Sequence, residues 1–267
     1  MKLTILVTTM HQNDFAVYDK MNLQTDAVIA NQCGNNGYQE ETHNGKFVKL
    51  VSTTSRGLSR NRNIALAHAS QDSDYLMFSD DDLVFNDGYE QMILDEFEKH
   101  PEAEAIKFNL HDLSKTRKIS MRRIQKWGKC TRRNMSSAGV CGVAIKQKTL
   151  KRIGLYFNEN FGSGTANYCG EDTIFLQAMI NAHVSFYRSP IDIAGIDQSE
   201  STWFKGYDKH YFEVSGMILG KCYPHIAKLL AVRSAHRRAK EKRCDFDFTT
   251  ILKAYLTGIK KVKKGEE

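Results

Sequence analysis

The sequence predicts an α/β fold, with a mostly parallel sheet flanked by helices and a helical extension at the C-terminus. Two patterns support this prediction. Over about the first hundred residues, short apolar runs alternate with helix-like segments, which is typical of a parallel sheet. From about residue 206 to the end, the chain turns helical and basic.

The expected elements follow one another in a regular order. Strands are expected over residues 3–9, 27–30, 47–51, 75–78, 105–108, 136–145 and 184–187. Helices are expected over residues 58–69, 88–100, 148–153 and 171–181, and again from 206 onward. The Gly-Ser-Gly sequence at 162–164 is expected to form a flexible loop.

The bulk composition indicates one large domain with an appendage. The chain has 267 residues, of which 41% are hydrophobic, enough for a sizeable core. It has no run of eighteen apolar residues, and its first nine residues are too short and too Thr-rich for a secretory signal. Six scattered cysteines without a CxxC pair then predict reduced thiols in a cytoplasmic protein.

Positive charge is concentrated at the C-terminal end of the chain. Residues 221–267 hold 13 Lys/Arg and 5 Asp/Glu, a net of +8, so the rest of the chain is at −1 for a total of +7. A near-neutral body argues against a nucleic-acid-binding core. The basic tail is instead expected to meet an anionic surface.

Three consecutive carboxylates, Asp80, Asp81 and Asp82, follow the apolar run 75–78. Two unit charges about 4 Å apart repel by about 4 kcal/mol at an effective dielectric of about 20. A Mg²⁺ or Mn²⁺ ion would relieve the repulsion, because carboxylate oxygens are hard ligands and ligands bind beyond the carboxyl ends of parallel strands. The alternative is an acidic turn in which an aspartate caps the helix that begins near Asp87.

Two arginines stand at the start of the helix expected from residue 58. Arg60 and Arg62 would face the positive end of the helix dipole, at a cost of a few tenths to about one kcal/mol. A bound phosphate would reverse this cost. The alternative is a solvated helix start with surface arginines.

Glu171 and Asp172 open a later helix, directly after Gly170. Acidic residues stabilise such a position as caps and through the helix dipole. One of the two carboxylates could instead face a cleft and take a proton from an acceptor hydroxyl, a task for which a carboxylate is an adequate base. The spacing alone does not choose between these roles.

Together these segments resemble the family 2 glycosyltransferases, which have the Rossmann-like GT-A fold and invert the anomeric centre. Four motifs occur in the family's order over residues 3–190. They are a first strand ending in Thr8-Thr9, a G-x-S-x-x-R-N segment at 57–63, a strand ending in D-x-D at 80–82, and an F-x-E-x-F-G…G-E-D stretch at 157–172. Each motif alone is weak, whereas four in order are strong.

The resemblance implies a metal-dependent, hexosyltransferase-type enzyme that moves one sugar from a nucleotide-diphospho-sugar, such as a UDP-sugar, to an acceptor hydroxyl. It implies that Asp80 and Asp82 hold Mn²⁺ or Mg²⁺ and that Asp172 is the catalytic base. Glu159 and Glu171 are implied to line the acceptor site. The residues implied in donor binding are Thr8, Thr9, Asn31, Arg62, Asp80 and Asp81.

The resemblance also divides the chain and places it in a pathway. A GT-A catalytic domain is expected over residues 1–212, with a nucleotide-sugar half at about 1–112 and an acceptor half at about 134–212. A basic helical extension follows over 213–267. Family members serve surface polysaccharide and glycolipid assembly, so a carbohydrate or lipid-linked acceptor is expected.

The chain departs from the family pattern at three places. Asn31 stands where the family usually has an aspartate that contacts the base, although an asparagine can still pair with uracil. Asp197 stands where a histidine often follows the late strand. The Q-x-x-R-W motif of processive synthases is missing around Trp203, which favours transfer of a single sugar over polymerisation.

Three other classes of protein were weighed against the transferase. A sugar-phosphate nucleotidyltransferase would carry a Gly-rich, Arg-containing loop after the first strand, and residues 10–14 have neither glycine nor arginine. A nucleic-acid binder would need a recognised motif beside its basic segments. A non-catalytic sugar- or nucleotide-binding protein, or a scaffold on the GT-A fold, stays as the alternative, and the carboxylates at 80, 82 and 172 speak against it.

A second basic segment lies between the two halves of the predicted catalytic domain. Residues 115–133 hold nine Lys/Arg and no acidic residue. Such clustering is costly without an anion, so the segment is expected to be a mobile loop that closes near the acceptor. The alternative is a solvated basic hairpin.

The tail combines an apolar helix face with positive charge. Apolar residues recur there at steps of three and four, the spacing of one helix face: Phe248, Ile251, Leu252, Tyr255, Leu256, Ile259 and Val262. The favoured prediction is that this face lies on an anionic membrane, on the inner face of the plasma membrane. The alternative is that it packs on the catalytic domain or on a second copy of the chain in a homo-oligomer.

Overall fold

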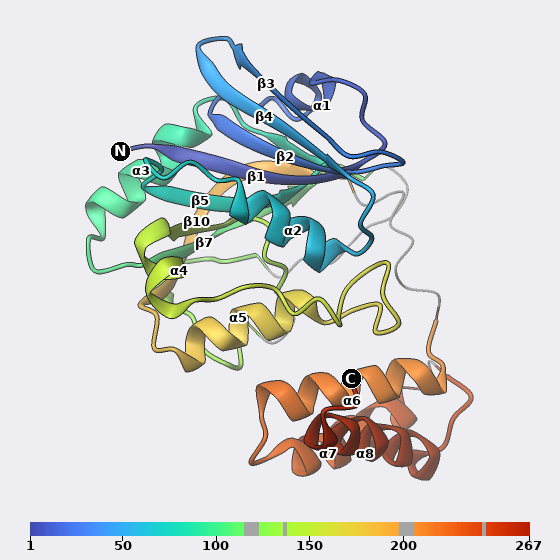
Figure 1. Ribbon diagram of the computed structural model, residues 1–267. Coiled ribbons are helices and arrows are strands. Elements are labelled where there is room, and N and C mark those ends of the chain that lie inside the picture. The colour runs from blue at the N-terminus through green and yellow to red at the C-terminus, as the bar shows by residue number, and fades with distance from the viewer. Residues whose placement is uncertain (115–122, 136–137, 198–205, 242–243) are drawn as a thin grey trace.

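The computed structural model describes residues 1–114, 123–135, 138–197, 206–241 and 244–267. A twisted sheet forms the middle layer, with helices on both of its faces (Figure 1). A separate group of three C-terminal helices lies below the helix α5 in this view (Figure 1). Among the described residues, no helix combines the length and apolar character that crossing a bilayer requires.

The described strands form one ten-stranded sheet. Its order is β3-β4-β2-β1-β5-β9-β7-β10-β6, with β8 paired to β10. The strands are β1 Leu3–Met10, β2 Asp26–Gln32, β3 Gly37–His43, β4 Lys46–Thr53, β5 Tyr75–Asp80, β6 Leu83–Phe85, β7 Ala105–Asp112, β8 Gly128–Lys129, β9 Val143–Lys146 and β10 Phe186–Ile196. The longer strands β1, β2, β4, β5, β7 and β10 all run in one direction, as the pairing shows, so the predicted mostly parallel α/β sheet is confirmed.

The helices fall into two layers and a C-terminal group. They are α1 Ala16–Lys20, α2 Leu58–Ala67, α3 Tyr89–Lys99, α4 Gln147–Ile153, α5 Glu171–Asn181, α6 Lys209–Cys222, α7 Ala227–Lys240 and α8 Phe248–Lys264. Side chains of α1 and α3 belong to the core on one face of the sheet. Side chains of α2, α4 and α5 belong to the core on the other face.

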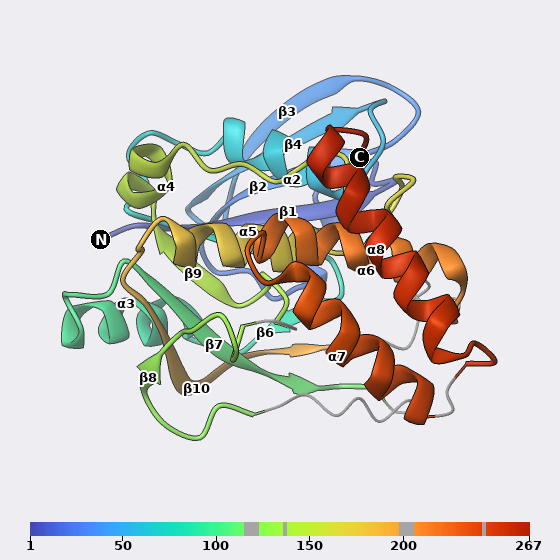
Figure 2. The same cartoon turned by 90° about the horizontal axis from the view of Figure 1, so that it is seen from below.

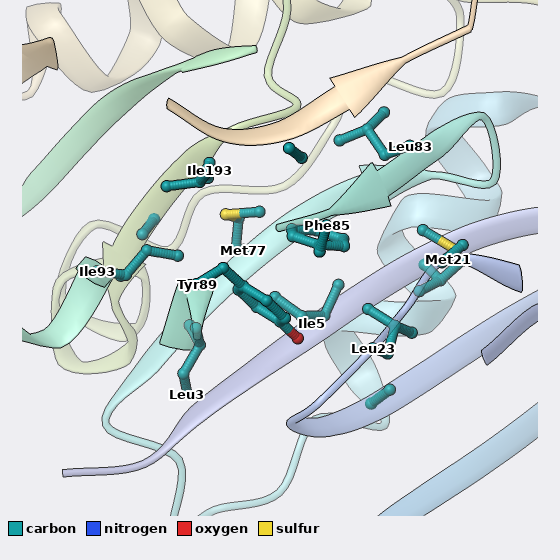
Figure 3. Packing of buried hydrophobic residues seen from close by; sticks show 14 of the residues in the cluster. Leu3, Ile5, Met21, Leu23, Met77, Leu83, Phe85, Tyr89, Ile93 and Ile193 are labelled. Carbon is teal, nitrogen blue, oxygen red and sulfur yellow. The ribbon is translucent and has the colours of Figure 1, made fainter. Parts of the chain in front are cut away.

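The central strands supply both cores because successive side chains of a strand point to opposite faces. Leu3 and Ile5 of β1 face the first core, where Figure 3 shows them with Met77 and Tyr89. Leu6 of β1 belongs to the second core. Burial on both faces explains why these strands read as continuous apolar runs in the sequence.

The strands β3, β6 and β8 are additional to the predicted ones, and one predicted strand is shorter than expected. The unpredicted strand β3 is polar and largely exposed, because it lies at the sheet edge and pairs only with β4 among the described residues. The strand expected over 136–145 begins only at Val143, since a turn with Gly142 at a positive φ of 76° precedes it. Residues 136–137 lie outside the described part of the chain.

The three C-terminal helices form a small core of their own. Ile251, Tyr255 and Ile259 of α8 are at most 5% exposed and belong to a cluster with Phe212 of α6 and Ala231 of α7. The favoured prediction, that this apolar face lies on a bilayer, is therefore wrong for these inner side chains. They pack inside the protein, which was the alternative.

The C-terminal helices also pack on the layers formed by the sheet and its flanking helices. Val214 and Met217 of α6 are buried against Phe161. A side chain at Gly170 would place its Cβ 2.3 Å from Ile218 Cδ1, so α6 lies tightly over the start of α5. The proposed boundary at residue 212 falls inside α6, and the division into a 1–212 domain and an extension stays a prediction.

Two glycines let α6 and α8 touch along their backbones. A Cβ added at Gly216 would lie 2.1 Å from the Tyr255 carbonyl oxygen, and one added at Gly258 would lie 1.9 Å from the Glu213 carbonyl oxygen. No side chain fits at either distance. The close approach of these helices therefore depends on both glycines.

We expect Gly258→Ala to destabilise the protein by about 1–3 kcal/mol, because α6 and α8 must move apart. In a helix without this contact the same change would stabilise by about 1 kcal/mol, so the sign is diagnostic. Thermal or denaturant unfolding measures the effect. Gly34→Ala is the control, since nothing lies within 4 Å of a Cβ there. Equal stability of the two variants would contradict the close contact.

Candidate active site

The carboxyl ends of β1 and β5 place two threonines beside two aspartates. In the parallel pairing of these strands, Thr8 lies opposite Asp80. Thr8 Oγ1 donates to Asp80 Oδ1 at 2.7 Å, and Thr9 Oγ1 donates to Asp81 Oδ2 at 2.6 Å. The sheet register therefore brings four of the predicted site residues together at the edge where α/β proteins bind ligands.

One buried guanidinium joins this edge to the second acidic motif. Arg62 of α2 is 1% exposed. Its Nη2 donates to both oxygens of Asp80 at 3.0 Å, and its Nη1 donates to Asp172 Oδ1 at 2.5 Å. Glu171 Oε1 lies 3.7 Å from the same Nη1. The predicted metal-side carboxylate and the predicted base are thus neighbours across a single side chain.

Hydrogen bonds to the protein interior hold the start of α2 in place. Asn61 Nδ2 donates to the carbonyl oxygens of Thr9 at 3.2 Å and Ala30 at 2.8 Å. Ser59 Oγ donates to the carbonyl oxygen of Phe161 at 2.6 Å. Ser59 and Asn61 are at most 5% exposed, so the polar residues of this helix start face protein rather than solvent.

The two arginines of α2 do not form the expected phosphate site in this structure. Arg60 Nε donates to Glu159 Oε2 at 2.8 Å, and Asn63 Nδ2 donates to Glu159 Oε1 at 3.1 Å. Arg62 is occupied by the carboxylates described above. Both cations at this helix start are therefore offset by carboxylates of the chain, and contact of Arg62 with a donor stays a prediction.

The carboxylates of the site respond differently to burial. Burial alone would raise the pKa of Asp80, but the Arg62 guanidinium and the hydrogen bond from Thr8 hold it below its usual value. Burial and the negative charge of Asp172 raise the pKa of Glu171 to about 7. The arginine therefore keeps Asp80 ionised, whereas burial beside Asp172 favours the protonated form of Glu171.

Asp82 is the carboxylate least satisfied by the protein. Burial, together with the charges of Asp80 and Asp81, raises its pKa to about 7. Its Oδ1 is buried and has no hydrogen-bond partner. A buried, unpaired carboxylate beside two others is costly, and a divalent cation would offset that cost. The residues present at 80–82 thus fit a Mg²⁺ or Mn²⁺ ion.

The chain alone does not complete a metal cage. Among the described residues, no three His, Cys, Asp or Glu side chains converge on one point. This is compatible with Mg²⁺, which is often held by one or two carboxylates together with substrate phosphates. The aspartate triplet does not cap α3 either, since the N-cap is Gly88 without a side-chain hydrogen bond.

A half-buried lysine that the sequence analysis missed holds a turn against the site. Lys107 Nζ donates to the carbonyl oxygens of Gly139, at 3.2 Å, and Cys141. A Cβ at Gly139 would lie 3.3 Å from Asp172 Oδ2, and the Cys141 thiol hydrogen-bonds Asp80. The turn therefore contacts both carboxylates. The available signal was a lone lysine inside an otherwise apolar strand segment.

Neither acidic residue at the start of α5 acts as an N-cap. The N-cap position is Gly170, at a φ of 100°, and no side chain caps it. Asp172 instead faces Arg62 and the turn at Gly139, with 24% of its side chain exposed. Glu171 packs against Gly162 and is 12% exposed. The cleft-facing alternative therefore fits Asp172 better than Glu171.

Asn31 lies beneath the surface of the site. It is fully buried, and its Oδ1 accepts from the Gln12 amide at 2.9 Å. Its Nδ2 donates to the Gln12 carbonyl oxygen at 2.8 Å and to Ser52 Oγ at 2.9 Å. The amide is thus committed to shaping the loop after β1. Direct pairing with a base stays a prediction that requires this loop to rearrange.

Asp197 lies near the aspartate triplet. Its backbone amide donates to the Asp82 carbonyl oxygen at 3.0 Å, and its charge contributes to the raised pKa of Asp82, after burial, Asp80 and Asp81. Trp203, which bears on the processive motif, lies outside the described residues.

The described part of the basic segment 115–133 is anchored to the sheet. Trp127 stacks between His100 and Tyr187, with ring centroids 3.6 and 5.0 Å away. Arg123 Nη1 donates to Asp192 Oδ2 at 3.2 Å. The expectation of a mobile loop that closes near the acceptor stays a prediction, and residues 115–122 lie outside the described part.

One family model matches the segment of the chain that carries most of the candidate site residues. Residues 34–163 match the family model described as glycosyl transferase family 2. The matched segment covers just under half of the chain. It includes Arg62, the triplet 80–82 and Glu159, whereas Asp172 follows it. A search of curated proteins returned no match to this chain.

Solved structures resemble the chain over its whole length. S. aureus TarS 1–349 in complex with UDP-GlcNAc matches with a TM-score of 0.63 at 13% identity, covering 100% of this chain and 93% of that one. The Pyrobaculum calidifontis mannosyltransferase PcManGT, in complex with GDP-Man and Mn²⁺, matches with a TM-score of 0.51 at 14% identity, covering 100% and 88%. The predicted GT-A fold is confirmed by these likenesses.

One similar structure extends beyond the matched region. It is a further structure of S. aureus TarS, which matches with a TM-score of 0.61 at 16% identity. That alignment covers 93% of this chain but 44% of the TarS chain. The chain therefore spans less than half the length of this protein.

We expect Arg62→Met to destabilise the protein by about 3 kcal/mol at neutral pH. Removing one partner of a buried ion pair costs about 3–5 kcal/mol, and partial exposure of Asp80 and Asp172 favours the lower end. Denaturant unfolding at pH 7 measures the loss. Arg60→Met is the matched control and should cost less than about 1 kcal/mol, because its pair with Glu159 is exposed.

The deficit of Arg62→Met should shrink in acid. Asp80 has a folded pKa below its unfolded value, so its stabilising contribution is present above the unfolded pKa and is lost as pH falls through the folded pKa. Wild type loses this contribution below about pH 4, whereas the variant never has it. A deficit that stays constant from pH 7 to about pH 2 would contradict the ion-pair role.

Proposed function

We propose that the protein is a metal-dependent, inverting, hexosyltransferase-type enzyme that moves one sugar from a nucleotide-diphospho-sugar to an acceptor hydroxyl. The observation that carries this proposal is Arg62, which joins the aspartate at the end of β5 to the aspartate at the start of α5. A donor-side carboxylate and a second carboxylate thereby stand at one place. Those are the two groups that a single displacement at an anomeric carbon requires.

The donor is proposed to be a UDP-sugar. S. aureus TarS 1–349 has been solved with UDP and with UDP-GlcNAc, and its TM-score of 0.63 exceeds the 0.51 of the GDP-Man-bound mannosyltransferase. We assign Thr8, Thr9, Asn31, Arg62, Asp80 and Asp81 to the donor side, with Asn31 acting through the loop at Gln12. The identity of the sugar is left to a screen of UDP-sugars.

Asp80 and Asp82 are proposed to hold Mn²⁺ or Mg²⁺. When bound, the ion would neutralise the leaving nucleoside diphosphate. The orphaned Oδ1 of Asp82 supports this assignment. The chain itself keeps Asp80 ionised through Arg62 and orients it through Thr8.

Asp172 is proposed to accept the proton of the attacking acceptor hydroxyl. Arg62 holds one of its oxygens, and the second oxygen lies beside Gly139, where the missing side chain leaves room. A fixed carboxylate with one free oxygen suits a general base. Glu159 and Glu171 are proposed to border the acceptor, although Glu159 is paired with Arg60 in this structure.

The acceptor is proposed to be a carbohydrate or a lipid-linked sugar of surface polysaccharide or glycolipid assembly. A cytoplasmic enzyme with a lipid-linked acceptor would work at the inner face of the plasma membrane. Because the inner face of α8 is buried, association with a membrane then requires outward-facing residues of the C-terminal helices. Homo-oligomerisation is a separate proposal, for which size measurement in solution is the test.

Asp172→Asn should bind the donor as wild type does and lose transfer by about 10²–10⁴-fold, the range of a general base. UDP release from a panel of UDP-sugars and donor-induced thermal stabilisation measure the two properties. Glu171→Gln, which removes a carboxylate from the adjacent position, should mainly raise the acceptor KM. Equal losses of donor binding and turnover in Asp172→Asn would instead indicate a structural role.

Binding of Mn²⁺ should weaken as pH falls below about 7, because protons compete with the metal for Asp82. Titration followed by electron paramagnetic resonance measures the affinity at pH 5.5 and 8. Asp82→Asn should bind Mn²⁺ weakly at both values and lose donor turnover, as should wild type in excess EDTA. The exposed Asp95→Asn is the control. Unchanged Mn²⁺ affinity in Asp82→Asn would remove this residue from the metal site.

A further inference from the structure

Helix α7 buries its small apolar side chains and exposes two of its large ones. The residues it buries are small: Ala227, Ala231 and Ala235 are at most 2% exposed. Two of its three larger aliphatic side chains face outward, with Leu229 at 69% and Val232 at 44% exposed, whereas Leu230 is half-buried. A surface helix normally turns its large apolar residues toward the core. Packing within the protein therefore does not account for the two outward side chains.

The same outward face of α7 carries only positive charge. Lys228, Arg233 and Lys240 are exposed beside the two aliphatic side chains, and the helix has no acidic residue. We call these five residues, Lys228, Leu229, Val232, Arg233 and Lys240, the outer face of α7. They lie within about four turns of one helix, so apolar area and charge are presented together.

Helix α8 continues this surface. The ring of Phe248, 37% exposed, lies 6.4 Å from the ring of His236 on α7. Along α8, Leu252 and Leu256 line a shallow groove with Lys253 and Lys260 among others. Like α7, α8 has no acidic residue between its first and last positions. The second helix thus repeats the combination of aliphatic and cationic side chains.

Both helices lie on the side of the C-terminal group away from the sheet. Helix α6 packs against α5, and α7 and α8 pack against α6. Figure 1 shows the two helices below α6, and Figure 2, seen from below, shows them in front of it. The surface is therefore turned outward, and the catalytic layers do not cover it.

The chemistry of this surface favours one occupant. A symmetric contact with a second copy would place the cations of one outer face against the same cations of the other, which is repulsive. A nucleic acid would use the cations but has no use for the exposed leucine and valine. The interface of an anionic bilayer accepts both, with aliphatic side chains in the acyl boundary and cations at the headgroups.

We propose that the outer face of α7, extended by α8, docks on an anionic lipid bilayer. The docking is independent of glycosyl transfer and goes beyond it. It uses none of the residues assigned to the candidate active site. The membrane contact is thereby assigned to the exposed faces of α7 and α8, and not to the buried face of α8.

Flotation with vesicles of phosphatidylcholine and 30% phosphatidylserine, at about 50 mM salt, tests the proposal. The full chain should float with these vesicles and should stay behind with pure phosphatidylcholine. The triple variant Lys228→Gln, Arg233→Gln and Lys240→Gln should bind about 100-fold more weakly, since each cation near the surface contributes about a factor of five. The pair Leu229→Gln and Val232→Gln should weaken binding at least fivefold without changing charge.

A matched control separates local from general electrostatics. Lys20→Gln, Lys99→Gln and Lys148→Gln remove three exposed cations from α1, α3 and α4 and should leave vesicle binding within about twofold. Thermal unfolding of each variant shows that it is folded. Because every readout is vesicle binding, failure of the proposed glycosyl transfer would not affect the result.

Several results would overturn the proposal. One is a full-length protein that ignores anionic vesicles at low salt. Another is binding that the control triple weakens as much as the α7 triple does. A concentration-dependent dimer that the Leu229/Val232 pair breaks, without vesicle binding, would assign the surface to a second copy. Binding of single-stranded DNA that the Leu229/Val232 pair leaves unchanged, again without vesicle binding, would assign it to nucleic acid.

Discussion

The site depends on one buried positive charge. Arg62 is the sole cation in contact with Asp80, Glu171 and Asp172 among the described residues, and the three come from two elements, β5 and α5. Without it, the two acidic motifs would repel one another across a poorly solvated space. With it, one guanidinium offsets only part of the negative charge, and the pKa of Glu171 is still raised, first by burial and then by the charge of Asp172. The ion pairs of Arg62 thus stabilise the fold at this place. They also leave an excess of negative charge at the site, which favours the binding of a cation.

The position of the aspartate triplet followed from the sequence because it depends on local pattern and on one rule of sheet geometry. An apolar run that ends in carboxylates must present them at the carboxyl edge of a parallel sheet, and Thr8 beside Asp80 bears this out. The direction of Arg62 did not follow. Its spacing from the helix start suits an outward phosphate site as well as an inward ion pair, and only the packing of α2 over β1 and β2 decides between them. The sequence did not assign Lys107 to the site either. Its position in an apolar strand was a signal, but its partners are main-chain oxygens of a turn, which no side-chain pattern predicts.

The tail shows a second limit of sequence patterns. A helix with one apolar face has the same periodicity whether that face meets lipid or protein. The residues that distinguish the two are Gly216 and Gly258, which cost helix stability unless a backbone approaches closely. Glycine at an inner position of an amphipathic helix was thus the available signal for helix-on-helix packing. Helix-on-helix packing involves the inner faces of these helices. It therefore does not explain the large aliphatic side chains on the outward face of α7.

The polar edge strand β3 has a consequence for behaviour at high concentration. Among the described strands it pairs on one side only, with β4, so its other side offers unpaired backbone groups to any extended chain. Glu40 and Glu41 lie in the middle of that strand, and a second molecule adding edge to edge would bring its own acidic pair close to them. The same polarity that hid β3 from prediction therefore protects a wide sheet against growing into fibres, and a β-branched apolar residue at either glutamate would remove that protection.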